Sequence, residues 1–258
     1  MKLPHTAVLP TTESSRSLLN RLQQQTLTAK EILSLLMTYQ LFPKLVSELL
    51  IDEAIASFTC SVEETLSVCQ NFYEQRQIYS EADRQAWLAR HQLSPQQLEQ
   101  LITRDRRIEK FKQVAWWHQL ESYFLQKKGQ LDRAVYSLIR TQDLHLAQEL
   151  YFRLQAGEQS FAELAQQYSQ GPEANTGGLI GPSELQTLHS GLAAKLAASQ
   201  PGQLLPPTSL GDWIVIVRLE KFIPAQLDEV MRRRLLDELF DRWLQEKLSR
   251  LNFEFPIT

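Results

Sequence analysis

The sequence predicts an α+β fold: a helical N-terminal lobe, a small domain of mixed strands and helices, and a long C-terminal helix that returns to the lobe. Three observations predict it. Residues 17–128 contain several helix-starting motifs and no glycine. All nine glycines lie between Gly129 and Gly211, where strand and helix patterns alternate. A long amphipathic pattern then follows Pro224.

Residues 1–16 are polar and rich in Pro, Thr and Ser, which predicts a flexible lead-in. Residues 17–128 are rich in Gln, Leu, Glu and Ala and are predicted to form a domain of four to six helices. Thr28 with Glu31 and Ser61 with Glu64 have the spacing of capping boxes. Ser94 precedes a proline at the first position of another helix.

Residues 129–222 are predicted to form the small α+β domain. Residues 134–139 and 213–219 are rich in β-branched and aromatic side chains, as strands are. Residues 144–154, 160–168 and 185–198 have helical patterns. The glycine-rich and proline-containing segment 171–178 is predicted to be a loop.

Residues 223–258 are predicted to form a long helix that starts at Pro224 and ends near Leu251. Its apolar residues form a broad stripe, which needs a partner surface. The small domain has little surface to spare, so we expect the stripe to pack on residues 17–128. The stripe contains Leu227, Val230, Met231, Leu235, Leu239, Trp243 and Leu248.

Composition excludes several classes of protein. The net charge is −3, whereas a nucleic-acid-binding domain is usually strongly basic, so we expect no nucleic-acid partner. No run approaches the 18 or more apolar residues of a membrane span, and the N-terminus lacks the apolar segment of a secretory signal. We therefore expect a cytoplasmic protein. No Cys/His cluster has the spacing of a zinc site, and we predict neither metal nor cofactor.

Several motifs of the central region occur together in a known family. They are Phe161-Ala162-Glu163-Leu164-Ala165, Tyr168-Ser169, Gly177-Gly178, Ile180-Gly181, Leu188, Leu192, Pro201-Gly202, Gly211 and Ile214-Val215. In this order they resemble the PpiC/rotamase segment of parvulin-type peptidyl-prolyl isomerases. The helical flanks are similar to those of SurA- and PrsA-type foldases. The resemblance implies a four-stranded rotamase sheet and proline-containing or unfolded polypeptide as partner.

The resemblance also implies a binding pocket for the proline ring. The family's apolar pocket positions align with Ile180, Leu188 and Leu192, which are all apolar here. The alternative is that these residues only form core, because Leu188, Leu192 and Leu196 are spaced as one stripe of a helix.

The family's polar groups around the rotating amide are replaced in this chain. Its two histidines align with Tyr136 and Trp213, which makes these the candidate catalytic positions. Its other polar positions align with Gly171, Leu179 and Leu210. The resemblance therefore implies a peptidyl-prolyl cis/trans isomerase or foldase of weak activity. The alternative is a chaperone or protein-interaction module derived from a parvulin and without catalysis.

Overall fold

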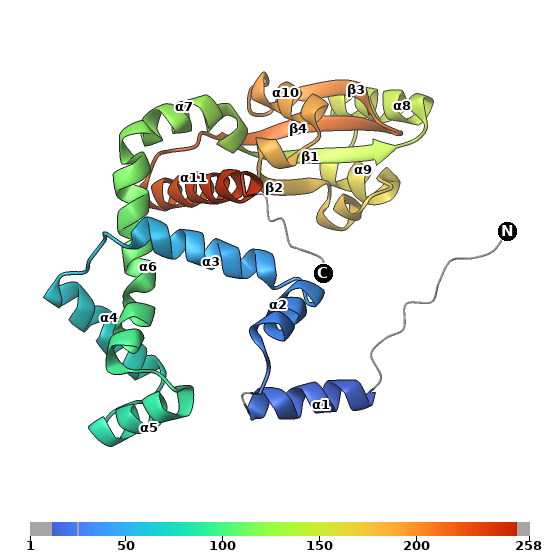
Figure 1. Ribbon diagram of the computed structural model, residues 1–258. Helices are drawn as coiled ribbons and strands as arrows, with labels where there is room; N and C mark the ends of the chain where they lie inside the picture. Colours follow the sequence, from blue (N-terminus) through green and yellow to red (C-terminus); the bar gives the residue numbers. More distant parts are fainter. Residues whose placement is uncertain (1–11, 25, 252–258) are drawn as a thin grey trace. The chain divides into compact units, whose positions relative to one another are not determined.

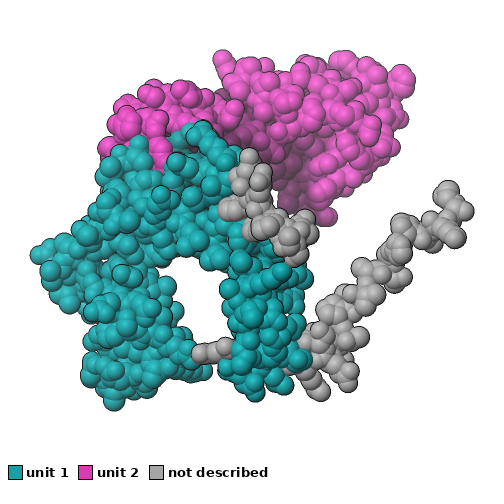
Figure 2. Space-filling model, viewed as in Figure 1, with its two compact units in different colours: residues 1–115, 238–258 teal, residues 116–237 magenta. Residues whose placement is uncertain are grey.

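The computed structural model describes residues 12–24 and 26–251. The chain divides into two compact units, which Figure 2 shows in different colours. Unit 1 comprises residues 1–115 and 238–258, and unit 2 comprises residues 116–237. Unit 2 therefore extends beyond the predicted small domain, 129–222, at both ends. Among the helices of the described residues, none is both long enough and apolar enough to cross a lipid bilayer.

Unit 1 is built from helices, and three of those described begin at a side-chain capping box. Thr28, Ser61 and Ser80 each accept a hydrogen bond from the backbone of the residue three positions later, and each forms a full capping box. The first two boxes confirm the sequence prediction. The helices are α1 (Thr12–Gln23), α2 (Ala29–Thr38), α3 (Phe42–Ile55), α4 (Val62–Gln75), α5 (Glu81–His91) and α6 (Pro95–Trp116).

The predicted lead-in, residues 1–16, overlaps the first helix. Helix α1 begins at Thr12, so residues 12–16 are helical. Residues 1–11, which make up the rest of the predicted lead-in, lie outside the described residues.

The long C-terminal helix, α11 (Glu229–Ser249), returns to the helical lobe as predicted. Within unit 1, the ring of Phe111 on α6 packs edge-on against Phe240 and Trp243 of α11, with ring centroids 6.2 and 5.2 Å away. Two details differ from the prediction. The helix starts five residues after Pro224, and Val230 is exposed rather than part of the buried stripe.

Unit 2 contains a four-stranded antiparallel sheet, visible in Figure 1, and this confirms the predicted fold class. The strand order is β2-β1-β4-β3. Its strands are β1 (Arg133–Thr141), β2 (Leu179–Glu184), β3 (Leu204–Leu210) and β4 (Trp213–Ile223). Its helices are α7 (Leu120–Leu131), α8 (Leu144–Ala156), α9 (Phe161–Tyr168) and α10 (Ser190–Ala197), with short 3-10 helices η1 (Trp117–Gln119), η2 (Pro172–Thr176) and η3 (Leu185–Thr187).

Each face of the sheet carries its own apolar core, because side chains alternate between the faces along a strand. On one face, which we call the α10 face, Leu192 and Leu196 of α10 pack with Tyr136, Leu138 and strand residues of β4. On the opposite face, α8 and α9 pack against Ile139 and Ile216. This alternation decides which residues of β1 and β4 can share a site.

Two strands and one helix boundary were not predicted from local patterns. β2 contains Pro182, and β3 contains Pro206 and Pro207. Both strands lie at sheet edges, where a missing backbone N–H is tolerated. The predicted helix 185–198 is broken: η3 ends at Thr187, Leu188 has an extended backbone, and α10 starts at Ser190.

Candidate functional site

The three predicted pocket residues lie together on the α10 face. Leu192 is buried in the core cluster of this face, whereas Ile180 and Leu188 pack against the cluster and stay partly exposed. Ile180 on β2 pairs directly with Tyr136 on β1. The three side chains therefore combine a buried floor with two apolar residues that a ligand can reach.

Leu188 also lines a cavity of about 440 Å³ on this part of unit 2. Its volume falls within the range of roughly 300–1,000 Å³ that is typical of ligand pockets. The side of α10 that borders the cavity carries small residues, whereas Leu192 and Leu196 are buried in the core. The lining comprises Gly129, Gln130, Leu185, Gln186, Leu188, Ser190, Ala193, Ala194 and Ala197.

Tyr136 and Trp213 share the α10 face but do not face each other. Tyr136 pairs with Leu219 on β4, six residues from Trp213. At about 3.3 Å per residue, the two positions lie about 20 Å apart along the sheet. The backbones of the two candidate catalytic positions are therefore not paired, and a catalytic role for either residue stays a prediction. Pairing register depends on contacts distant in sequence, and local motifs do not reveal it.

The β1 side chain beside Trp213 is Arg140. Arg140 pairs with Val215, one position from the Thr141–Ile214 pair, and lies on the same face as Tyr136. Its guanidinium carbon lies 6.0 Å from the centroid of the Trp213 ring, within cation–π range. Sequence reasoning did not single out Arg140, although it follows Tyr136 by four residues and therefore has the same parity along the strand.

A buried carboxylate holds Arg140 in place. Nε and Nη2 of Arg140 donate to the two oxygens of Glu173, at 2.7 and 2.6 Å. The Glu173 side chain is only 1% exposed. The Ser169 hydroxyl donates to Oε1 of Glu173 at 2.6 Å and accepts a hydrogen bond from the Arg140 backbone. We call Arg140, Glu173 and Ser169 the ion-pair cluster.

The ion-pair cluster keeps Glu173 charged. Burial by itself raises the pKa of this carboxyl, but hydrogen bonds from Arg140 and Ser169 outweigh it and place the pKa below its ordinary value of 4.5. The pKa of Tyr136 is raised, mainly by burial; the positive charge of Arg140 lowers it and the negative charge of Glu173 raises it further. The tyrosine is therefore a neutral phenol near two fixed charges.

Gly171 makes room for the ion-pair cluster. A Cβ atom at this position would lie 2.3 Å from Nε of Arg140 and 2.3 Å from Oε2 of Glu173. Separations below 3.0 Å do not occur, so any other residue here would displace the pair. Position 171 is where the family carries a polar loop residue. The charged pair thus fills the space that a side chain at 171 would need.

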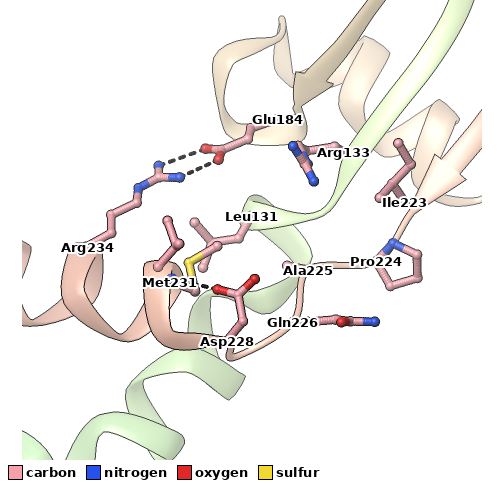
Figure 3. A pocket seen from close by; sticks show the side chains of 11 residues that line it. Leu131, Arg133, Glu184, Ile223, Pro224, Ala225, Gln226, Asp228, Met231 and Arg234 are labelled. Carbon is pink, nitrogen blue, oxygen red and sulfur yellow. Dashed lines mark hydrogen bonds and ion pairs between the residues drawn. The ribbon is translucent and has the colours of Figure 1, made fainter.

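A second cavity, of about 370 Å³, lies where β4 leads into α11 (Figure 3). Arg234 of α11 donates to both carboxylate oxygens of Glu184 on β2, and Asp228 caps α11 by accepting from the Met231 backbone. None of the five predicted site residues is among those that line this cavity. The ion pair between Arg234 and Glu184 joins α11 to the sheet.

Asp132 ties together the two chain segments that enter and leave the sheet. Its Oδ1 accepts a buried hydrogen bond of 2.7 Å from the backbone N–H of Ala225. Replacing Asp132 with alanine would leave that N–H without its acceptor, so we expect unfolding free energy to fall by about 1–3 kcal/mol. Denaturant unfolding measures it. Asp132→Asn keeps an acceptor oxygen and is expected to lose less, and equal losses would contradict this role of the hydrogen bond.

A protein-family model matches most of the sheet-containing region of the chain. Residues 137–221 match the family model described as Rotamase, the PPIC-type PPIASE domain. No curated protein matches the chain.

Several solved structures are similar to this chain at low sequence identity. A peptidylprolyl isomerase (PrsA) from Bacillus cereus is 15% identical, with a TM-score of 0.50 over 97% of this chain and 94% of its own. PrsA from Bacillus anthracis is 19% identical, with a TM-score of 0.44 over 82% and 100%. A SurA-like chaperone from Campylobacter jejuni is 17% identical, with a TM-score of 0.35 over 97% and 98%. The similarity to the Bacillus cereus structure concerns the fold.

Proposed function

We propose that this chain, whose residues 137–221 form a rotamase domain of the parvulin (PpiC) type, binds proline-containing or unfolded polypeptide and acts as a weak peptidyl-prolyl cis/trans isomerase or foldase. One observation carries the proposal. Ile180, Leu188 and Leu192 belong to one apolar cluster, and the first two keep exposed surface for a ligand. Burying a proline ring there would favour binding by a few kcal/mol.

Weak activity is expected because the polar positions that the family carries around the rotating amide are replaced in this chain. Rotation about an X–Pro bond crosses a barrier of about 18–20 kcal/mol and breaks no covalent bond. Enzymes lower such barriers mainly with preorganised polar groups, and desolvation contributes as well. Tyr136 and Trp213 stand in place of the family's two histidines, and Gly171, Leu179 and Leu210 offer no polar side chain.

A chaperone or interaction module without catalysis is the second candidate. It is favoured by the number of large apolar side chains that unit 1 leaves exposed, because exposed apolar surface is available to bind polypeptide. The cytoplasmic location expected from the N-terminal sequence stays a prediction. The exposed residues of the first three helices include Leu19, Leu22, Ile32, Leu33, Met37, Leu45 and Leu49.

A protease-coupled isomerisation assay on a proline tetrapeptide tests the proposal, with an ordinary parvulin as the reference enzyme. We expect a rate above the uncatalysed reaction and well below the reference. Leu188→Asp should abolish the excess rate, because it places a charge at a half-buried pocket position. Leu188 suits this test better than Leu192, which is too buried to be charged without unfolding the core.

The matched control is Leu125→Asp, which changes an exposed leucine of α7 in the same unit. It should leave the rate unchanged. Peptide binding without any excess rate would favour the interaction module. If both variants retain the wild-type rate and fold, the active surface is not the α10 face.

A further inference from the structure

The guanidinium of Arg140 keeps hydrogen-bond donors that Glu173 does not use. Nε and Nη2 each donate to Glu173, and within the described part of the chain no acceptor is recorded for Nη1. The side chain is 30% exposed, whereas its carboxylate partner is almost completely buried. Glu173 therefore fixes the guanidinium in place, while part of the guanidinium remains exposed to solvent and to a ligand.

Arg140 and the predicted pocket share the α10 face. Ile180 pairs with Tyr136, which precedes Arg140 by four residues on β1. Trp213, beside Arg140, pairs with Leu210 across the tip of the β3–β4 hairpin. The first turn of α10 approaches this tip, since a Cβ at Gly191 would lie 3.1 Å from Cδ2 of Leu210. Leu192 follows Gly191 directly. A proline ring between Ile180 and Leu192 would thus lie on the face of the sheet that carries Arg140.

The chemistry of a twisting amide suits such a donor. A planar X–Pro amide delocalises the nitrogen lone pair into the carbonyl, which gives the C–N bond its double-bond character. As the bond rotates, that delocalisation is lost and the lone pair returns to the nitrogen, which becomes a hydrogen-bond acceptor. A cationic N–H aimed at this atom therefore stabilises the twisted amide more than the planar one, as a catalyst must.

We propose that Arg140 is the catalytic donor of this chain, with Nη1 donating to the prolyl nitrogen as the amide rotates. Glu173 is a positioning residue. It accepts hydrogen bonds from Nε and Nη2 of Arg140, and this leaves Nη1 for the substrate. Arginine suits the role because its donors lie in a rigid plane and it stays charged at any physiological pH. This inference rests on the proposed function and names the polar group that serves it.

The sheet offers a matched control on its opposite face. Arg218 of β4 donates to Oε1 of Glu220 at 2.8 Å, and Ser137 donates to the same oxygen at 2.5 Å. The Arg218 guanidinium lies 5.1 Å from the ring centroid of Phe161, in the core on the α8 and α9 side. This arginine, carboxylate and serine repeat the chemistry of the ion-pair cluster away from the pocket.

The test compares two double variants by exchange NMR on a proline tetrapeptide, with the peptide affinity and the melting temperature measured beside the rate. Arg140→Met with Glu173→Gln removes both charges, so neither is left buried and unpaired. We expect it to lose about tenfold or more of the rate enhancement, in the range known for removing one donor. Its peptide affinity should stay within about twofold. Arg218→Met with Glu220→Gln should retain both rate and affinity.

Each outcome decides between the inferences. An unchanged rate in folded Arg140→Met/Glu173→Gln, or an equal loss in the Arg218 control, would overturn the role of Arg140. Wild-type protein that binds the peptide without speeding rotation would also overturn it, while leaving the binding module intact. Absence of peptide binding would instead overturn the proposed function. If the first variant does not fold, Arg140→Lys serves as the test. Lysine can still pair with Glu173, but it lacks the additional N–H donors of the guanidinium. A wild-type rate in this variant would refute the catalytic role of Arg140.

Discussion

Replacing Glu173 with alanine is expected to lower the unfolding free energy of unit 2 by about 3–5 kcal/mol, as is usual when one partner of a buried ion pair is removed. The Arg140 guanidinium would lose both carboxylate contacts, and the Ser169 hydroxyl would lose its acceptor. Denaturant unfolding followed by tryptophan fluorescence measures the loss. Glu220→Ala on the opposite face is the control, and it should cost far less because Glu220 is 27% exposed.

The stability from Glu173 should depend on pH in one direction. Its folded pKa lies below the ordinary value of 4.5, so its contribution is complete above that value and is lost as the pH falls through the folded pKa. The difference in unfolding free energy between wild type and Glu173→Gln should therefore be constant near neutral pH and shrink below about pH 4.5. A difference that is independent of pH down to strong acid would contradict a charged Glu173.

The double change Tyr136→His with Trp213→His is expected to destabilise unit 2 by about 3–5 kcal/mol, the cost of losing a large core aromatic, without raising isomerase activity. Tyr136 is 3% exposed and Trp213 packs against the same core. Because Tyr136 pairs with Leu219, the backbones of positions 136 and 213 are offset by six residues along the sheet, or about 20 Å, and we expect the two imidazoles not to face each other.

Thermal melting read beside the isomerisation rate checks this expectation, and the two single changes separate the contributions. The Trp213→His variant alone should carry a substantial part of the loss in stability. A gain in rate in the double variant that neither single variant has would show that the two positions cooperate. That result would contradict the register of β1 and β4.

Local sequence signals predicted the elements that local chemistry controls. The capping boxes at Thr28 and Ser61 mark true helix starts, and the run from Trp213 to Leu219 lies in β4 as expected. Local patterns did not predict strands β2 and β3, because both contain proline, which is unusual in strands. The prolines are tolerated because both strands lie at the edges of the sheet.

The sequence pointed to the apolar residues of the candidate site but not to its charged residues, and a binding role for the apolar residues stays a prediction. Ile180, Leu188 and Leu192 gather as the motif implied, although Leu188 is not on the helix that its spacing suggested. The ion pair joins Arg140 and Glu173 across 33 residues, and neither residue stands in a recognisable motif. Gly171 was the available signal, because a glycine in place of a polar residue leaves space for another group.

The most direct test of the account is a methyl NMR titration of the full chain with a proline tetrapeptide. Binding on the α10 face predicts that the Ile180, Leu188 and Leu192 methyl signals shift together, with an affinity on the order of micromolar to millimolar for one buried ring. The Leu188→Asp variant should show no such shifts at Ile180 and Leu192, whereas Leu125→Asp should show them unchanged. Shifts confined to the helices of unit 1, with none at these three residues, would contradict the account.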